Sequence, residues 1–467
     1  MPSVRAATRR NGKALETTEE PLSYGIRWRN FRGFSDTSWL ELPPLTILIG
    51  PNSAGKTSVI APLVILNQTM QSRDAGTPIV TNGALFDGGS FQNLLTDRDP
   101  EHELSLGIRF HAHEPKDAPK PIKKVGTYPP GGLEVSFRMG DDHHKAKLTQ
   151  YTVSDIFLRT LVSRTLQKSG RYSISHMPGG DLTLVERKVL RDSKPHHFLF
   201  NATLDLREFI PKETEEGQVE PQFTSAFSLY LSVVSYVFAE IRSLLDDLSY
   251  VGPLRDRPRH SYPIISESPR SVGPTGDRAA NLMRQRFSEL QPRLDQWVRA
   301  FEFGDSVEYK DLSGDFFAIN FLANGRATNI ADAGFGASQV FPLIVQALAS
   351  ARQTLTLAEQ PEIHLNPRLQ SQLADLFVEM ANTERRVIVE THSEHLLLRL
   401  RRLIAEGKID NKRVALYFVE KNDDRSTIQR VAIGPNGHIA PETWPKGFFG
   451  DTLRESLALA AAQSQHS

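Results

Sequence analysis

Runs of apolar and polar residues predict regular structure near both ends of the chain. Close to the start, loosely alternating or continuously apolar runs at residues 24–29, 37–42 and 45–49 predict three strands. Residues 58–71 place apolar side chains at helical spacing, which predicts a helix shortly after the third strand. The pattern therefore predicts strand, turn and helix in direct succession.

Two stretches rich in proline, glycine and basic residues interrupt this pattern, at residues 113–131 and 250–280, and both predict exposed connections. Between them, strand-like runs occur at residues 133–138, 172–176 and 182–186, followed by an apolar helix at 223–248. Serines interrupt that helix and charged residues follow its uncharged part at once. We therefore expect a buried helix and no membrane span.

The C-terminal half alternates between helical and strand patterns. Helices are predicted at residues 292–301 and 340–351, and strands at 306–312, 316–322, 354–358 and 385–389. This alternation of buried strands with helices predicts a mixed α/β fold.

The turn between the third strand and the first helix carries a phosphate-binding pattern. Residues 50–57 read GPNSAGKT and fit the pattern GxxxxGK[ST] at every fixed position. In such a loop, backbone N–H groups wrap the phosphates, Lys56 reaches the β- and γ-phosphates and the Thr57 hydroxyl binds Mg²⁺. A glycine turn with an incidental lysine is the alternative, but the flanking strand and helix are the context that the motif requires. The predicted phosphate ligands are Asn52, Ser53, Ala54, Gly55, Lys56, Thr57 and Ser58.

Segments of the C-terminal half are also suited to a nucleotide. Residues 332–339 have small side chains, open the helix predicted at 340–351 and offer a helix N-terminus to an anion. The strand at 354–358 ends in Glu359, and a carboxylate at that edge of a strand is placed to bind Mg²⁺ or its water. The strand at 385–389 is followed by Glu390, Thr391, His392 and Ser393.

Composition narrows the class of protein only slightly. Basic and acidic residues number 55 each, so the formal net charge is 0 and contact with nucleic acid would need a local patch. Cysteine is absent, which excludes disulfides, thiolate metal sites and a cysteine nucleophile. Residues 1–20 are polar and lack the apolar centre of a signal peptide, so we expect a disordered tail and a cytoplasmic protein.

The order of these motifs resembles a known family. The phosphate loop, GxGxSQ at residues 334–339, EQPExHLxP at 359–367 and ETHSEHLLLRL at 390–400 follow one another as in ATP-binding-cassette ATPases. The resemblance is to their chromosome-maintenance and OLD-like branch, especially to a bacterial group of stand-alone ATPases with a characteristic C-terminal segment. It extends to NFRGF at residues 30–34, GPLR at 252–255, ALYFVE at 415–420 and WPKGFF at 444–449.

This resemblance implies an α/β fold with a cassette-type ATPase head. Its mixed sheet would be split in sequence, so that the N-terminal strands and the phosphate loop pair in space with the C-terminal strands. The predicted divisions are a disordered tail at 1–20, the two parts of the head at 21–100 and 291–450, an inserted α+β module at 101–290 and a C-terminal helix or tail at 451–467.

The resemblance also assigns roles to residues of the C-terminal half. Gly336, Ser338 and Gln339 match the signature loop that contacts the γ-phosphate bound by the opposite subunit. ATP would therefore join two heads into a dimer or a larger homo-oligomer. Glu359 matches the Walker B acid, a ligand of the metal, and His392 matches the switch histidine that touches the γ-phosphate. The implied cofactors are ATP and Mg²⁺.

One position departs from the family pattern in a way that bears on catalysis. The Walker B acid is normally followed by a glutamate that polarises the attacking water, and this chain has Gln360 there. A general base contributes about 10²–10⁴-fold, so we expect slow turnover and a long-lived ATP-bound dimer unless Glu362 or Glu390 supplies the carboxylate. A glutamine can still position water, as in small GTPases, so Gln360 is compatible with slow hydrolysis.

Four further polar residues belong to or lie near these motifs. His364 follows the pattern, and Asn366 stands where many relatives have another histidine; we expect both to be interface or structural residues rather than metal ligands. Gln92 and Gln71 are two candidates for the polar glutamine loop of cassette ATPases, and the choice between them stays open.

Three hypotheses for function follow. The leading one is an ATP-dependent switch that controls a separate effector, a nuclease, as related ATPases do in bacterial anti-phage systems. The chain itself is predicted to lack a nuclease site, because the acidic run at residues 420–424 is followed by no DxD. The second is a DNA-engaging repair ATPase, and the third is a scaffold that binds ATP without hydrolysing it. Phosphate contacts to DNA would come from Arg255, Arg257, Arg259 and the lysines within 120–124, although a salt-bridged loop is the preferred interpretation of the arginines.

Overall fold

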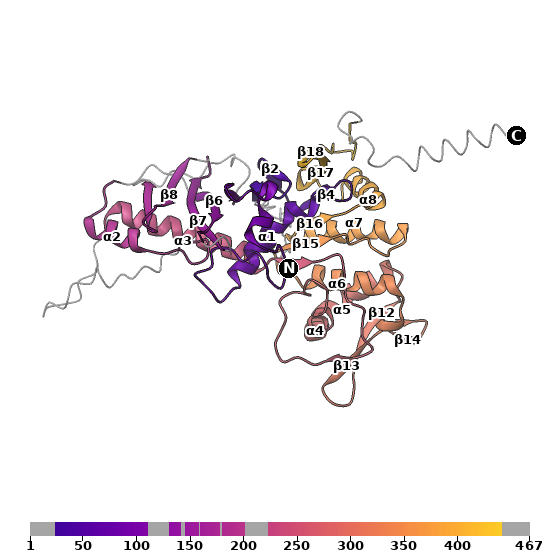
Figure 1. The fold of residues 1–467 in the computed structure, drawn as a ribbon. Coiled ribbons are helices and arrows are strands. Elements are labelled where there is room, and N and C mark those ends of the chain that lie inside the picture. The colour runs from indigo at the N-terminus through magenta and orange to yellow at the C-terminus, as the bar shows by residue number, and fades with distance from the viewer. Residues whose placement is uncertain are drawn as a thin grey trace, which may run out of the picture.

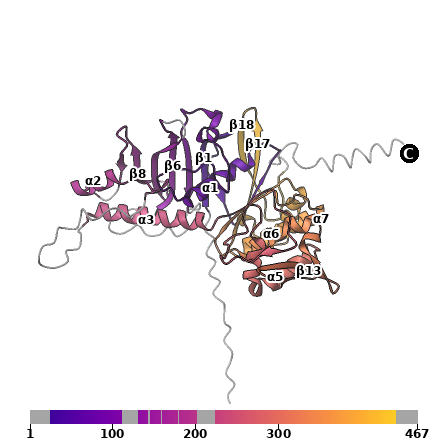
Figure 2. The same ribbon diagram turned by 60° about the horizontal axis from the view of Figure 1, so that its bottom comes forward.

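The computed structural model describes residues 24–110, 130–141, 145–157, 159–177, 180–200 and 223–440. The predictions for residues 1–20, 113–129 and 451–467 lie outside the described residues, as do the lysines of 120–124 and the WPKGFF segment at 444–449. Figures 1 and 2 show two neighbouring parts of the molecule. One part is an antiparallel sheet with the helices that pack against it, and the other is formed mainly by the C-terminal half of the chain.

A mostly parallel sheet forms the centre of the C-terminal half. Six strands of the described chain lie in the order β10-β15-β16-β4-β17-β18, and only the β17–β18 pair is antiparallel. Their bounds are β4 Leu45–Ile49, β10 Ser249–Val251, β15 Leu355–Glu359, β16 Arg386–Glu390, β17 Val414–Asn422 and β18 Arg425–Val431. Strand β4 is thus the N-terminal strand placed between two C-terminal ones. The mixed α/β fold with a sheet split in sequence is confirmed.

Four helices of the described chain cover the parallel sheet. They are α1 Lys56–Met70, α6 Phe335–Ala349, α7 Pro367–Asn382 and α8 Glu394–Ala405. Of these, α1, α7 and α8 each follow one of its strands. All five residues of β4, β15 and β16 are buried, because helices lie on both faces of a parallel sheet and leave neither face to water. The carboxyl ends of β4, β15 and β16 therefore lie along one edge, where β4 leads into the phosphate loop.

A separate antiparallel sheet forms the other side of the molecule (Figure 2). Eight described strands take part in the order β2-β1-β5-β6-β7-β8-β9, with β3 also paired to β1. They are β1 Tyr24–Phe31, β2 Phe34–Asp36, β3 Leu40–Leu42, β5 Leu104–Arg109, β6 Pro130–Met139, β7 Ala146–Asp155, β8 Thr160–Leu166 and β9 Tyr172–His176. Strand β1 pairs with β5, so the division predicted at residue 100 falls inside one sheet.

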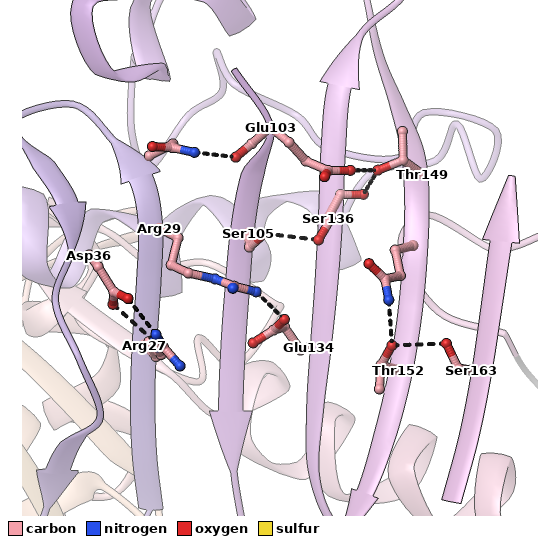
Figure 3. Close-up of polar contacts among 12 residues, drawn as sticks. Arg27, Arg29, Asp36, Glu103, Ser105, Glu134, Ser136, Thr149, Thr152 and Ser163 are labelled. Atoms are coloured by element: carbon pink, nitrogen blue, oxygen red, sulfur yellow. Dashed lines mark hydrogen bonds and ion pairs between the residues drawn. The ribbon is translucent and has the colours of Figure 1, made fainter. Parts of the chain in front are cut away.

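Polar side chains on the exposed face of this sheet form hydrogen bonds and ion pairs between strands, as Figure 3 shows. Arg27 of β1 donates to Asp36 of β2 at 2.9 Å, and Arg29 of β1 pairs with Glu134 of β6. Ile26 and Trp28, which alternate with these arginines, are fully buried on the opposite face. The alternation follows from the two-residue period of a strand, and it leaves one apolar face for helices to cover.

The buried face of the antiparallel sheet is covered by helix α3, Ser225–Asp246, which contacts β6, β8 and α1. The helix is long and apolar enough to cross a membrane by length and composition. Its buried positions recur every three or four residues, as in Tyr230, Val234 and Val237, which is the spacing of a helix packed on one side. It therefore lies on the sheet as a core helix.

The prediction of a strand at residues 182–186 is wrong, because Leu184–Asp192 form helix α2. Thr183 caps this helix: its side chain accepts from the Glu186 N–H, and the Glu186 carboxylate accepts from the Thr183 N–H at 2.7 Å. The same carboxylate accepts from the N–H and hydroxyl of Thr224, the N-cap of α3, at 2.7 and 3.0 Å. Glu186 thus joins the first turns of both helices.

Replacing Glu186 with glutamine is expected to lower the free energy of unfolding at pH 7 by about 1–2 kcal/mol, because charge-assisted hydrogen bonds become neutral ones. Burial alone would raise the pKa of Glu186, but the hydrogen bonds from Thr224 and Thr183 outweigh it and lower the pKa. A lowered pKa gives stability that is present above the ordinary value and lost as pH falls through the folded-state value. Urea unfolding of both proteins should show the difference at pH 7 and its decline below pH 4.5; a constant difference would contradict the assignment.

A small third sheet packs beside helix α6. Among the described residues its strands are β11 Tyr262–Pro263, β12 Ser306–Asp311, β13 Phe316–Ala323 and β14 Arg326–Asn329. Helices α4 Ala279–Gln285 and α5 Phe287–Ala300 lie between this sheet and α6. Short 3-10 helices occupy Phe91–Leu94, Thr96–Arg98, Ile330–Asp332 and Asn411–Arg413. Strand β10 and α4, which precede the division predicted at residue 290, contact elements of the C-terminal half.

Candidate nucleotide site

The phosphate loop joins β4 to α1 and is shaped by two glycines. Gly50 has φ +150°, and a Cβ atom there would stand 2.0 Å from the carbonyl oxygen of Val419 on β17. Gly55 has φ +103° at the residue before α1, a left-handed conformation that side chains disfavour. Both glycines of the motif are therefore required by the backbone, and the loop lies tightly against the neighbouring strand.

Lys56 is 3% exposed and folds back on its own loop. Its ammonium donates to the carbonyl oxygens of Gly50 at 3.0 Å and Pro51 at 2.8 Å. Burial lowers the pKa of Lys56, while the nearby carboxylates of Glu390 and Glu362 act in the opposite direction. The lysine is thus a buried cation held by main-chain carbonyls at the position where the motif places phosphate oxygens.

Two acidic residues end neighbouring strands beside the loop. Glu390 ends β16 and accepts a hydrogen bond from the Thr57 hydroxyl at 3.0 Å. Glu359 ends β15 in register with Glu390 and accepts a hydrogen bond from the Tyr250 hydroxyl at 3.1 Å. Burial, with the nearby charge of Glu390, raises the pKa of Glu359 to about 7. Burial also raises the pKa of Glu390, with Lys56 and Thr57 opposing.

Glu362 and His392 are joined at the same edge of the sheet. The His392 N–H donates to Glu362 Oε1 at 2.6 Å. Burial raises the pKa of Glu362, although hydrogen bonds from the His392 N–H, its own N–H and the Thr391 side chain act to lower it. Burial and the charge of Lys56 lower the pKa of His392, so its imidazole is neutral at pH 7. The structure therefore brings these two predicted residues together beside Lys56.

Gln360 occupies a turn in a left-handed conformation, with φ +43°. Its N–H donates to the Glu390 carbonyl oxygen at 2.7 Å, which ties the turn to β16. His364 is also left-handed, with φ +64°, and the Asn366 side chain caps α7 by accepting from the Leu369 N–H at 3.0 Å. A non-glycine residue in the left-handed region carries strain of about 1–3 kcal/mol. The backbone of the segment after β15 is therefore strained at Gln360 and His364.

Neither candidate for the glutamine loop contacts the phosphate loop through a hydrogen bond in the described residues. The Gln92 amide donates to the Arg98 carbonyl oxygen at 2.9 Å. Gln71 follows the last residue of α1 and donates to Asn67 at 3.1 Å. Since α1 has 15 residues, Gln71 lies about 22 Å along the helix from the loop.

The second group of predicted residues lies on a different element from the phosphate loop. Gly336, Ser338 and Gln339 belong to the first turns of α6, which begins at Phe335, so the prediction of a loop continuing to residue 339 is wrong. A Cβ atom on Gly336 would contact Leu365 at 3.5 Å. The Gln339 side-chain amide donates to the Arg255 carbonyl oxygen at 3.4 Å and to Ser338 Oγ at 3.3 Å.

Sequence reasoning missed Tyr250 in this region and gave Arg255 a different role. Tyr250 holds Glu359, and it ends up there because β10 pairs with β15 in parallel, with Tyr250 opposite Leu357. Arg255 is 6% exposed and donates to main-chain carbonyl oxygens. The prediction that it belongs to a salt-bridged loop is therefore wrong, and so is the prediction that it is available to contact DNA. GPLR at 252–255 was the one available signal.

The residues present suit a magnesium nucleotide. The Thr57 hydroxyl and the Glu359 carboxylate are hard oxygen donors, the type that Mg²⁺ takes beside phosphate oxygens and water. Within the described residues, no group of three or more His, Asp or Glu side chains is arranged to hold a metal by itself. A metal at this edge would therefore be held jointly by the chain and a nucleotide, and it would supply charge neutralisation at the phosphates.

Comparison with known proteins identifies the class of this domain. Residues 275–397 match a family described as AAA ATPase domain (AAA_15), and residues 409–459 match a family described as a protein of unknown function (DUF3696). A search among curated proteins found no match. The family match and the phosphate loop together define an ATPase domain, whose two sequence segments meet in the parallel sheet.

Several solved structures are similar to the chain, each over 88% of its length. One is an SMC head bound to the C-winged helix domain of ScpA, with 12% identity, a TM-score of 0.43 and 98% of that chain covered. Another is the SMC head domain from Thermotoga maritima, with 14% identity, a TM-score of 0.35 and 99% covered. A third is an Smc head with an extended coiled coil, bound to the C-terminal domain of ScpA derived from Pyrococcus furiosus, with 11% identity, a TM-score of 0.34 and 96% covered.

Proposed function

We propose that this protein is an SMC-like, cassette-type ATPase that binds ATP·Mg²⁺, joins with a second copy through shared ATP sites and thereby controls a separate effector. The observation that carries the proposal is that the two predicted halves of the site lie on different elements, the phosphate loop before α1 and the first turn of α6. The phosphate loop contacts Glu390 through Thr57, whereas Gln339 in α6 contacts Arg255. A second copy would supply the missing half to each site.

The start of α6 suits the role of a contact made between copies. Its first turn offers backbone N–H groups and the positive end of the helix dipole, both of which attract phosphate oxygens. Ser338 and Gln339 are buried within their own subunit and hold this turn in place. In the proposed dimer, the turn faces the γ-phosphate held by Lys56 of the other copy, so each ATP is bound between the two copies and joins them.

Hydrolysis in this proposal is slow, because an amide stands where a general base is expected. Gln360 cannot accept the proton of the attacking water. Glu362 and Glu390 both lie near Lys56, and burial raises the pKa of each, which makes a carboxylate more basic. Either could replace the missing base, and the result would be a switch with a long ATP-bound phase.

The effector part of the proposal rests on the resemblance to OLD-like stand-alone ATPases. By that analogy the effector is a nuclease, the setting is bacterial anti-phage defence and the compartment is the cytoplasm. The alternative of a DNA-engaging ATPase retains one structural support. Arg257 and Arg259 help to line a cleft of about 1120 Å³ between the end of α3 and helices α4 and α6.

The decisive experiment combines ATP turnover with molar mass from light scattering, with and without ATP·Mg²⁺. We expect the native protein to gain mass with ATP and to hydrolyse it slowly. Gln360→Glu is expected to raise turnover by roughly 10²-fold, the lower range of a general base, and to shorten the lifetime of the dimer. Gln370→Glu serves as the control amide replacement.

Each result has a distinct meaning for the proposal. A native protein that binds ATP but stays monomeric would refute the shared site. Turnover that rises steeply with duplex DNA and falls with salt would favour the DNA-engaging alternative. ATP-driven assembly with no detectable turnover would identify the non-hydrolysing scaffold.

A further inference from the structure

Arg255 is a buried cation that touches two functional elements at once. Its guanidinium donates to the carbonyl oxygens of Glu359 at 3.0 Å and Gln360 at 3.3 Å, at the end of β15. The other terminal nitrogen donates to the carbonyl oxygen of Gln339 in α6 at 3.3 Å. Gln339 in turn donates from its side chain to the Arg255 carbonyl oxygen. One side chain thus links the strand that carries the acid to the helix that carries Ser338.

The segment that carries Arg255 is itself anchored on both sides. The Gly252 N–H donates to the Pro274 carbonyl oxygen at 2.8 Å, and the Asp256 N–H donates to the Thr275 carbonyl oxygen at 2.9 Å. Strand β10, which ends at Val251, pairs directly with β15. The guanidinium therefore projects from a fixed backbone, so a movement of β15 or α6 would change the lengths of its hydrogen bonds.

These contacts differ from an ordinary structural ion pair. In the described part of the chain, the hydrogen bonds of Arg255 all go to main-chain carbonyl oxygens. Burial lowers the pKa of Arg255 to about 10, so the group stays charged at neutral pH. A buried charge without a directly paired carboxylate is costly, and an uncharged donor could fasten two elements at lower cost. This suggests that the rigid, forked geometry of arginine serves a purpose beyond packing.

We infer that Arg255 is a positioning residue that couples the ATP bound by its own subunit to the signature turn that this subunit presents to the other copy's ATP. The inference rests on the proposed function, since it needs shared sites. Glu359 would contact the metal of its own site, while the first turn of α6, which Ser338 and Gln339 hold in place, would contact the nucleotide of the second site. Because Arg255 bonds to both elements, a change at Glu359 on metal binding would be transmitted through its hydrogen bonds to the start of α6. The residue therefore contributes to cooperativity between the two sites rather than to ATP affinity.

Arg255→Lys is the variant that tests this inference. A lysine keeps the charge but carries a single ammonium, which cannot span both carbonyl groups as the fork does. The matched control is Arg257→Lys, two residues along on the same segment, where the side chain is exposed and lines the cleft. For each protein we would measure ATP affinity at a concentration that keeps it monomeric, then the Hill coefficient of turnover, the ATP-induced molar mass and the melting temperature.

The expected result is a split between binding and coupling. Arg255→Lys should bind ATP within about threefold of the native protein, while ATP-induced dimerisation weakens by roughly 10-fold and the Hill coefficient falls toward 1, a typical size for lost coupling between sites. Arg257→Lys should leave all four readouts unchanged. A purely structural role would instead lower the melting temperature and weaken ATP binding together.

Two outcomes would overturn the inference, and they are distinguishable from failure of the proposed function. A folded Arg255→Lys protein with native dimerisation and an unchanged Hill coefficient would show that the bridge carries no coupling. Parallel losses of melting temperature, ATP affinity and dimerisation would show that Arg255 only holds the fold. Failure of the native protein itself to bind ATP or to dimerise would overturn the proposed function, and the inference with it.

Discussion

Replacing Lys56 with alanine is expected to weaken ATP binding by at least about 100-fold, since losing a charge-assisted contact with the phosphates costs roughly 3 kcal/mol. The ammonium is buried and lies on the carbonyl oxygens of Gly50 and Pro51, inside the loop that would hold the phosphates. ATP binding would be measured by calorimetry in the presence of Mg²⁺. ATP-induced gain of mass should disappear in the same variant.

The control for this experiment is Lys408→Ala, which removes an exposed lysine beyond the end of α8 and should leave ATP binding unchanged. A folded Lys56→Ala protein that binds ATP as tightly as the native one would refute the phosphate-loop assignment. Because Lys56 offsets the charges of Glu390 and Glu362, the variant should also be examined by thermal unfolding. That measurement separates loss of binding from loss of structure.

Glu359→Gln is expected to stabilise the protein in the absence of Mg²⁺ and nucleotide while abolishing most turnover. The pKa of Glu359 is raised to about 7 from an ordinary 4.5, so deprotonation of the folded protein is unfavourable on the order of 3 kcal/mol. The folded state holds a proton between pH 4.5 and 7 that the unfolded state has lost. Stability of the native protein therefore falls with rising pH across that window and stays lower above it.

The stability difference should thus be absent below pH 4.5, grow between pH 4.5 and 7, and reach its full size above pH 7. Chemical unfolding of both proteins at pH 4.5, 6 and 8 would measure it, and a difference independent of pH would contradict the account. Turnover should fall by about 10²-fold or more, because a ligand that neutralises charge at the transferred phosphate is lost. Glu308→Gln, on strand β12, is the matched control and should change neither quantity.

The phosphate loop was predictable because its requirements are local. Gly50, Gly55, Lys56 and Thr57 act within one turn, and the apolar run before them could only be a buried strand. The structure places Thr57 beside Glu390 and His392 beside Glu362, residues that the sequence had grouped by motif alone. Those motifs are short and follow buried strands, so their positions at one edge of a sheet were implied by the pattern.

Other features could not be inferred from local pattern. The strand predicted at residues 182–186 became helix α2 because the capping contacts of Thr183 and Glu186 outweighed a short apolar alternation. The membership of β1 in the same sheet as β5 depends on pairing with strands far along the chain. The roles of Tyr250 and Arg255 likewise arise only when β10 pairs with β15.

By itself, the sequence determined the nucleotide-binding loop, the buried strands that lead to the acidic residues and the mixed α/β class. These depend on backbone conformation and on the spacing of apolar residues, both of which are properties of neighbouring positions. Tertiary structure alone decided that β4 lies between β16 and β17 and that Glu359 faces Tyr250. It also decided that Arg255 bridges β15 and α6. These contacts join residues about 80 to 370 positions apart, and only the packing of the whole sheet brings them together.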